Sequence, residues 1–452
     1  MYQFVPQEAQ HITGDIHLEK QKLDELMKRF RNFPDFVSEM SSQDLAHVAT
    51  TDLFQLILAG ALAAKASDIH IEAEENNARI RFRMDGILHD AVAKLPLHGY
   101  GNLVTRIKLL SRLKINVREE AQDGRFTIKL PTKELEVRVS LIPSEFGETI
   151  VMRLLDPDSI SVGLPELGLR PDDLKLVEVE LSKPNGLILN TGPTGSGKTT
   201  TLYAFIRHVT NPEIKIITVE DPIEYRIEGI EQTQVDAEAG YTFASGLRSI
   251  LRQDPDVILV GEIRDRETAD IALQAALTGH IVFSTLHTND AIGAVPRLVD
   301  LGVNTSTIGP ALSLMIAQRL VRKLCDSCRK AVPLSPGDLE KTKKLIENLP
   351  ARVDKTPYQT FVESSDKAVV YEKVGCPACN GFGYKGRIGI FEFLRSDTEF
   401  QEAILQNASP VALRRIAEKQ EMVTMQRDGI LKVLAGQTTF DEVKEATGPL
   451  GW

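Results

Sequence analysis

A glycine-rich loop near the middle of the chain constrains the fold more than any other feature. It follows an apolar run, 186–190, and leads into a second apolar segment, 202–206. This order of strand, glycine loop and helix is the setting that a phosphate-binding loop requires. Glycines adopt backbone angles that other residues avoid, so successive N–H groups can point at one anion. The loop comprises Gly192, Pro193, Thr194, Gly195, Ser196, Gly197, Lys198, Thr199 and Thr200.

The last residues of this loop indicate which anion it binds. Lys198 places a positive charge within reach of the outer phosphates of a nucleoside triphosphate, and the hydroxyl of Thr199 can ligate Mg²⁺. The alternative is a glycine-rich turn with a surface lysine. The complete spacing of the motif, set between strand and helix, favours nucleotide binding over that alternative.

Length and charge limit the remaining choices. A chain of 452 residues is expected to form about three domains. The net charge of −10 argues against a nucleic-acid motor without excluding one, because such motors usually carry a basic domain. We find no apolar run of the roughly 20 residues that a membrane helix needs and no signal peptide at the N-terminus. The expected compartment is the cytoplasm.

The apolar patterns divide the chain into five segments. They are an amphipathic extension (1–45), an α+β domain (46–160), a P-loop ATPase domain (161–320), a tetracysteine segment (321–395) and a helical C-terminal segment (396–452). In the extension, one helical stripe is formed by Leu23, Leu26, Met27 and Phe30. This stripe packs either on its own domain or against a partner or membrane surface.

Short apolar runs in the ATPase segment predict an α/β fold with a parallel sheet. The runs cover 187–190, 214–219, 257–260 and 281–284, with helical patterns between them. Parallel strands buried on both faces have this continuous apolar character.

Carboxylates follow two of these runs. Glu220 comes directly after the second run and Glu262 follows Gly261 after the third. The carboxyl ends of neighbouring strands meet at the ligand crevice of such a sheet, where one acidic residue must hold Mg²⁺ and another must orient water. We take Glu262 as the catalytic or magnesium-linked carboxylate and Glu220 as its helper, and the division of roles stays open. A strand-end capping role is the alternative.

Two histidines, His280 and His287, flank the fourth run. A histidine near neutral pH can change its charge, so His287 is a candidate to sense the γ-phosphate. A purely structural role is equally compatible with the pattern.

Arginines recur on the expected strands of the α+β domain. They are Arg81, Arg83, Arg125, Arg138 and Arg153. The pattern alone leaves two interpretations open, a solvated strand face and an anion-binding surface.

The four cysteines form two C-x-x-C pairs, Cys325 with Cys328 and Cys376 with Cys379. Two such pairs in a reducing compartment predict one closed, structural tetrahedral Zn²⁺ site. A redox pair is the minor alternative.

Taken together, these motifs resemble a known family. The loop 192–200, the segments 217–225 and 251–265, Thr278–His280 and the segment 284–290 closely resemble the GspE/PilB family of type II secretion and type IV pilus assembly ATPases. In that family the motifs are the Walker A, Asp box, Walker B and His box. Gly261 before Glu262 is the family's own pattern.

The resemblance implies a fold, a mechanism and partners. It implies a PAS-like α+β domain, a RecA-like ATPase domain that uses ATP and Mg²⁺, a zinc-binding insertion and a helical C-terminal subdomain. It also implies a homohexamer at the inner membrane, bound to a platform protein and a cytoplasmic docking protein, in which Arg125 and Arg138 reach the phosphates. Hydrolysis would then drive assembly of pilin-like subunits.

Two other functions share the P-loop. A nucleic-acid translocase or conjugation-type ATPase is the main alternative, although the acidic balance leads us to expect no nucleic-acid partner. Pilus retraction motors resemble the same family but generally lack the tetracysteine, so the two C-x-x-C pairs count against them.

Overall fold

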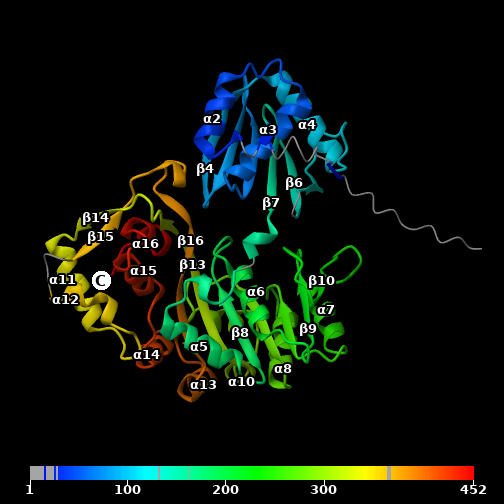
Figure 1. Cartoon of the computed structure of the whole chain (residues 1–452). Coiled ribbons are helices and arrows are strands. Elements are labelled where there is room, and N and C mark those ends of the chain that lie inside the picture. The colour runs from blue at the N-terminus through cyan, green and yellow to red at the C-terminus, as the bar shows by residue number, and fades with distance from the viewer. Residues whose placement is uncertain are drawn as a thin grey trace, which may run out of the picture. The chain divides into compact units, whose positions relative to one another are not determined.

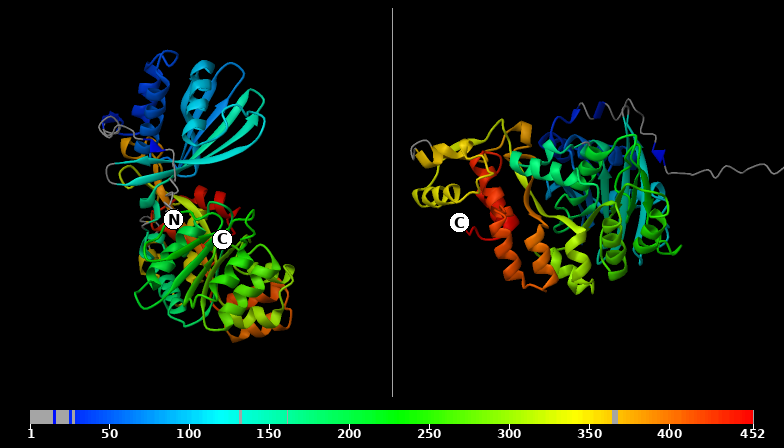
Figure 2. Two further views of the ribbon diagram at one scale, coloured as in Figure 1. Left: turned by 90° about the vertical axis from the view of Figure 1, so that its right-hand side faces the viewer. Right: turned by 90° about the horizontal axis from the view of Figure 1, so that it is seen from below.

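The protein is described by a computed structural model, shown in Figure 1 and from two further sides in Figure 2. The structure describes residues 15–16, 25–26, 29–130, 133–160, 162–363 and 368–451. The chain divides into two compact units, residues 1–159 with 375–382 and residues 160–374 with 383–452.

The first unit is a seven-stranded sheet with helices on one face. The strand order is β1-β5-β6-β7-β2-β3-β4. The strands are β1 (Asp15–Ile16), β2 (Asp68–Ala73), β3 (Ala78–Met84), β4 (Ile87–Leu95), β5 (Gln122–Lys129), β6 (Glu134–Ser144) and β7 (Gly147–Leu155). The helices are α2 (Phe33–Ser42), α3 (Thr50–Ala63) and α4 (Leu97–Leu110). The five arginines that we expected on strands do lie on strands, in β3, β5, β6 and β7.

The core of this unit forms where the helices meet the sheet. Helix α3 is buried almost all round, because its sequence is apolar on every face. Helix α2 crosses it closely: a Cβ on Gly60 would lie 2.2 Å from the Phe36 ring. Only glycine at position 60 therefore permits this approach.

The predicted N-terminal stripe is partly described. Leu23 and Met27 lie outside the described residues. Phe30 is buried, and Leu26 packs against the same core as α2 and α3. These two residues favour the first alternative, in which the stripe packs on its own domain.

The segment 375–382 belongs to the first unit although it is distant in sequence. The backbone N–H of Phe33 donates to Asn380 Oδ1 (2.9 Å). The rings of His89 and Phe382 stack with their centroids 4.0 Å apart. The second C-x-x-C pair is thus carried on a segment that packs against α2 and β4.

The second unit is built on a seven-stranded sheet of order β10-β9-β11-β12-β8-β13-β16. All neighbours are parallel except β13 and β16. The strands are β8 (Gly186–Thr191), β9 (Ile216–Glu220), β10 (Glu231–Gln234), β11 (Val257–Val260), β12 (Ile281–Leu286), β13 (Leu312–Leu324) and β16 (Tyr384–Arg395). The four runs that predicted a parallel sheet became β8, β9, β11 and β12.

Helices cover both faces of this sheet. One face carries α5 (Pro171–Leu181) and α6 (Lys198–Val209). The opposite face carries α7 (Phe243–Ile250), α8 (Arg266–Leu277), α9 (Ala294–Asp300), α10 (Thr305–Ala311), α13 (Thr398–Leu405) and α14 (Pro410–Lys419). Alternate residues of the same strands enter the two cores, as expected for a sheet that is buried on both sides.

The sheet extends beyond residue 320, where we expected the ATPase domain to end. Strand β13 continues to Leu324 and pairs with β16, which lies within the predicted tetracysteine segment. We placed the boundary there because the character of the sequence changes after Arg319. The strand nevertheless continues, because its paired neighbour β16 supplies both hydrogen bonds and apolar cover.

A smaller layer completes the unit. It contains β14 (Lys330–Pro333), β15 (Val369–Glu372), α11 (Pro336–Glu347), α12 (Gln359–Glu363), α15 (Met425–Leu434) and α16 (Phe440–Thr447). Figure 1 shows α15 and α16 between the β13–β16 edge and the α11–α12 region. Among the described residues, every helix is too short or too polar to cross a lipid bilayer.

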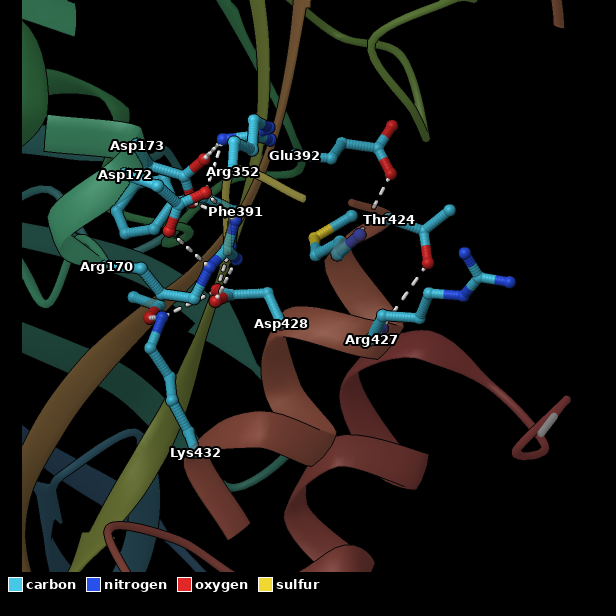
Figure 3. A network of polar contacts seen from close by, with 12 residues as sticks. Arg170, Asp172, Asp173, Arg352, Phe391, Glu392, Thr424, Arg427, Asp428 and Lys432 are labelled. Atoms are coloured by element: carbon cyan, nitrogen blue, oxygen red, sulfur yellow. Dashed lines mark hydrogen bonds and ion pairs between the residues drawn. The ribbon is translucent and has the colours of Figure 1, made fainter. Parts of the chain in front are cut away.

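A buried charge cluster ties this layer to the start of the unit (Figure 3). Its members, three cations and three anions, are Arg170, Arg352, Lys432, Asp172, Asp173 and Asp428. Asp428 lies at the centre. It accepts from Arg170 Nη1 (2.6 Å), Lys432 Nζ (2.5 Å) and the backbone N–H of Phe391 (2.8 Å). Equal numbers of opposite charges allow these groups to stay buried.

Candidate nucleotide-binding site

The phosphate loop joins β8 to α6, as the sequence predicts. Gly195 and Gly197 have φ values of +80° and +90°, in the left-handed region that favours glycine. A Cβ on Gly197 would also lie 2.8 Å from Gln318 Nε2. The hydroxyl of Ser196 is buried and has no hydrogen-bond partner within the described residues. Lys198 is the first residue of α6, so the positive end of the helix dipole also points at the loop.

Lys198 curls back over the loop. Its Nζ donates to the carbonyl oxygens of Gly192 (2.8 Å) and Pro193 (3.1 Å). Burial lowers the pKa of Lys198, the charge of Glu262 opposes that shift, and the charge of Arg319 adds to it. Thr199, the predicted magnesium ligand, is exposed beside it.

Glu262 lies just past the end of β11, two strands away from the loop in the sheet. Its carboxylate is mostly shielded and contacts Arg264 Nη2 (2.5 Å) and His287 Nε2 (3.4 Å). The structure therefore brings two of the predicted residues, Glu262 and His287, into one contact. The charge of Glu262 also opposes the lowering of the Lys198 pKa by burial. The carboxylate, the His287 imidazole and the Lys198 ammonium group therefore all lie at the end of the sheet that carries the phosphate loop.

Glu220 has a different environment. It is buried and accepts three hydrogen bonds, from Tyr203 Oη (2.5 Å), Thr218 Oγ1 (2.7 Å) and Gln232 Nε2 (3.1 Å). Burial raises its pKa, and these donors counteract the shift. This carboxylate is held in place by protein donors, which suits a supporting role better than direct activation of water.

The two histidines also differ. His280 hydrogen-bonds through Nδ1 to the carbonyl oxygen of Ala275 (2.9 Å) at the end of α8. His287 has an exposed ring, and the residue after it is tied to the base of the phosphate loop. The backbone N–H of Thr288 donates to Thr191 Oγ1 (2.7 Å). The His287 loop is thus anchored to the strand that carries the nucleotide.

In the first unit, four of the five predicted arginines form a row across the sheet, and Arg81 lies outside it. Arg125 is the register partner of Arg138, and Arg138 is the partner of Arg153. The row continues through Asp68 to Arg83. Asp68 is buried and accepts from Arg153 Nε at 3.0 Å. Like charges directly opposite one another are destabilising, and carboxylates offset part of this charge, because Glu136 pairs with Arg138 (3.6 Å) and Asp68 pairs with Arg153 and Arg83.

The four cysteines form one cluster. Their Sγ atoms all lie within 4.8 Å of one another, and none of them is in a disulfide. Such a group is compact enough for four bonds of about 2.3 Å to one zinc ion. Cys325 and Cys379 are buried, so the donor set fits a closed structural site. The residues that would hold the ion are the four that the sequence predicts.

Removal of the metal is expected to loosen this part of the chain. We expect about one zinc ion per chain in freshly purified, reduced protein, and a lower melting temperature after chelation, because the free energy of metal binding no longer contributes to folding. Metal analysis and circular dichroism would measure both. Cys325→Ser is expected to lose the ion, whereas Ser327→Ala in the same turn should retain it. Metal-free protein with an unchanged melting curve would contradict the assignment.

Some residues of the site were not found from the sequence. Gln318 is buried beneath the loop, where its Oε1 accepts from Asn190 Nδ2 (2.9 Å) and Thr201 Oγ1 (2.8 Å). Tyr203 holds Glu220. No local motif marks either residue. The available signal was a polar residue directly after the apolar run 314–317, at Gln318 in β13.

Together, the fold and the loop define the class of protein, a P-loop ATPase with a mixed α/β sheet. A family model described as "Type II/IV secretion system protein" matches residues 42–445. The chain therefore belongs to the type II/IV secretion system protein family, a family of ATPases, and the resemblance seen in the motifs is confirmed.

Individual relatives agree with this placement. The chain is 45% identical over 394 residues to a putative type II secretion system protein E of Escherichia coli, covering 86% of this chain and 75% of that protein. It is 41% identical over 398 residues to the type IV pilus assembly ATPase PilB of Myxococcus xanthus, covering 88% and 68%. Among solved structures, the pilus retraction motor PilT with bound ADP aligns with a TM-score of 0.57 and 26% identity, over 87% and 96% of the two chains.

Proposed function

We propose that the chain is the ATP-hydrolysing motor of a type II secretion or type IV pilus assembly machine. The observation that carries the proposal is the phosphate loop with Lys198 and Glu262 at one end of one sheet. Lys198 and the loop would hold the triphosphate, and Thr199 and Glu262 would hold Mg²⁺. When bound, Mg²⁺ would neutralise charge on the β- and γ-phosphates.

The finer features of the family belong to this proposal. We infer a homohexamer in which the first unit is the PAS-like domain and the second contains the RecA-like ATPase domain, the zinc-binding subdomain and the helical C-terminal subdomain. Arg125 and Arg138 would supply positive charge to the phosphates, supported by their position as register partners. The motor would act in the cytoplasm, bound to the inner membrane through a platform protein and a docking protein.

A steady-state assay tests the function. The full chain is expected to hydrolyse ATP only with Mg²⁺, with a rate that does not respond to DNA. Hydrolysis strongly stimulated by DNA, with DNA binding that weakens steeply as salt rises, would instead support the nucleic-acid translocase. Light scattering with a non-hydrolysable ATP analogue would measure the assembly state.

A further inference from the structure

Arg319 lies beside the phosphate loop and has no role in the function proposed above. Strand β13 runs parallel to β8, with Ala317 opposite Thr191 at the end of β8. The next residues of β13 therefore continue alongside the start of the loop. A Cβ on Gly192 would lie 2.5 Å from the Gln318 carbonyl oxygen and 3.2 Å from Arg319 Nη1. The Arg319 guanidinium is thus in contact with the loop backbone.

The hydrogen-bond partners of Arg319 are all neutral. Its Nη1 donates to the carbonyl oxygen of Gln318 (3.2 Å) and its Nη2 to that of Asn289 (3.4 Å). Within the described part of the chain, no carboxylate lies within ion-pair distance of it. The side chain is half-buried, and burial lowers its pKa, an effect that the charge of Glu392 partly opposes. A partly buried cation without a counter-ion is unfavourable until an anion arrives.

Lys198 is a second partly buried cation beside the loop. It too donates only to carbonyl oxygens. Burial lowers its pKa, the charge of Glu262 opposes that shift, and the charge of Arg319 adds to it. The two cations therefore repel each other across Gly192. An anion placed between them would remove this repulsion and accept from both.

Sheet order shows from which side Arg319 approaches. Strand β8 lies between β12 and β13, and Glu262 follows β11 beyond β12. Glu262 and Arg319 therefore flank the loop from opposite sides. Glu262 would act at the γ-phosphate, so we expect a group on the opposite side of the loop to contact the phosphates that remain in the product.

We propose that Arg319 is a nucleotide-binding residue that donates to phosphate oxygens of the loop-bound nucleotide from the side opposite Glu262. The proposal rests on the ATPase function above and extends it. Because these contacts are the same before and after hydrolysis, Arg319 contributes to binding rather than to the chemical step.

The test compares three variants of the full-length chain. For Arg319→Gln we expect the Kd for a fluorescent ADP analogue to rise about 10-fold or more, because a charge-assisted hydrogen bond is lost. The Kd for the matching ATP analogue should rise by a similar factor, with a much smaller change in kcat. Arg319→Lys should recover part of the affinity, since lysine keeps the positive charge but lacks the planar guanidinium group that can donate two parallel hydrogen bonds. Arg415→Gln, an exposed arginine on α14, serves as the matched control.

Melting without nucleotide separates binding from folding. The melting temperature of Arg319→Gln should be no lower than that of Arg415→Gln, because the Arg319 side chain contacts only carbonyl groups in the described part of the chain. A lower melting temperature than the control, an unchanged Kd for ADP, or a fall in kcat at unchanged Kd would each overturn the proposal. If the wild-type chain binds no nucleotide, the ATPase function itself fails. If it binds normally and Arg319→Gln binds as tightly as Arg415→Gln, only the role of Arg319 is rejected.

Discussion

Glu262→Gln is expected to reduce ATP turnover by at least about 100-fold, the usual scale for loss of a positioned acid–base or charge-stabilising group. Nucleotide affinity should change far less, because Lys198 and the loop backbone remain intact. The reason is geometric. Glu262 is the shielded carboxylate that contacts Arg264 and His287, whereas Glu220 is already occupied by three protein donors. Glutamine keeps the shape of the side chain and removes only its charge.

Phosphate release and analogue binding would be measured side by side. Glu238→Gln, an exposed glutamate on the loop after β10, is the matched control and should turn over ATP at the wild-type rate. Lys198→Ala gives a useful contrast, since it should weaken binding as well as turnover. Wild-type hydrolysis by Glu262→Gln would exclude this carboxylate from the chemistry.

Asp428→Ala is expected to destabilise the second unit by about 3–5 kcal/mol, the scale for breaking a buried ion pair from one side. Asp428 is 1% exposed and faces two cations. Without it, Arg170 and Lys432 keep their charges in a buried environment, and the backbone N–H of Phe391 loses its acceptor. Thermal and urea unfolding would record the effect.

Two further variants separate charge from packing. Asp428→Asn combined with Lys432→Met removes one charge of each sign and should recover part of the lost stability, because the cluster is again balanced. Asp300→Ala, an exposed aspartate at the end of α9, should leave unfolding unchanged. An Asp428→Ala chain as stable as wild type would show that water or rearrangement compensates these cations.

The sequence predicted the features that depend on short stretches of chain. The phosphate loop, the four central strands and the position of Glu262 after β11 follow from local pattern and from the rule that parallel strand ends meet. Contacts between distant residues were not predictable in this way. Gln318 lies 128 residues from Asn190, and Arg170 lies 258 residues from Asp428. These contacts exist only because β13 is placed beside β8 and α15 beside the start of α5, which no local pattern specifies.

The pairing of β13 with β16 has a consequence for biosynthesis. On the ribosome, β13 is complete before residues 325–383 have been synthesised. The edge of β13 that pairs with β16 is therefore unpaired during this time. An unpaired edge strand is a template for association with other chains. Arg170 likewise has no Asp428 to pair with until the chain is 258 residues longer. The second unit therefore cannot complete its folding until β16 and α15 have been synthesised. Nascent or prematurely terminated chains are the species that chaperones must protect.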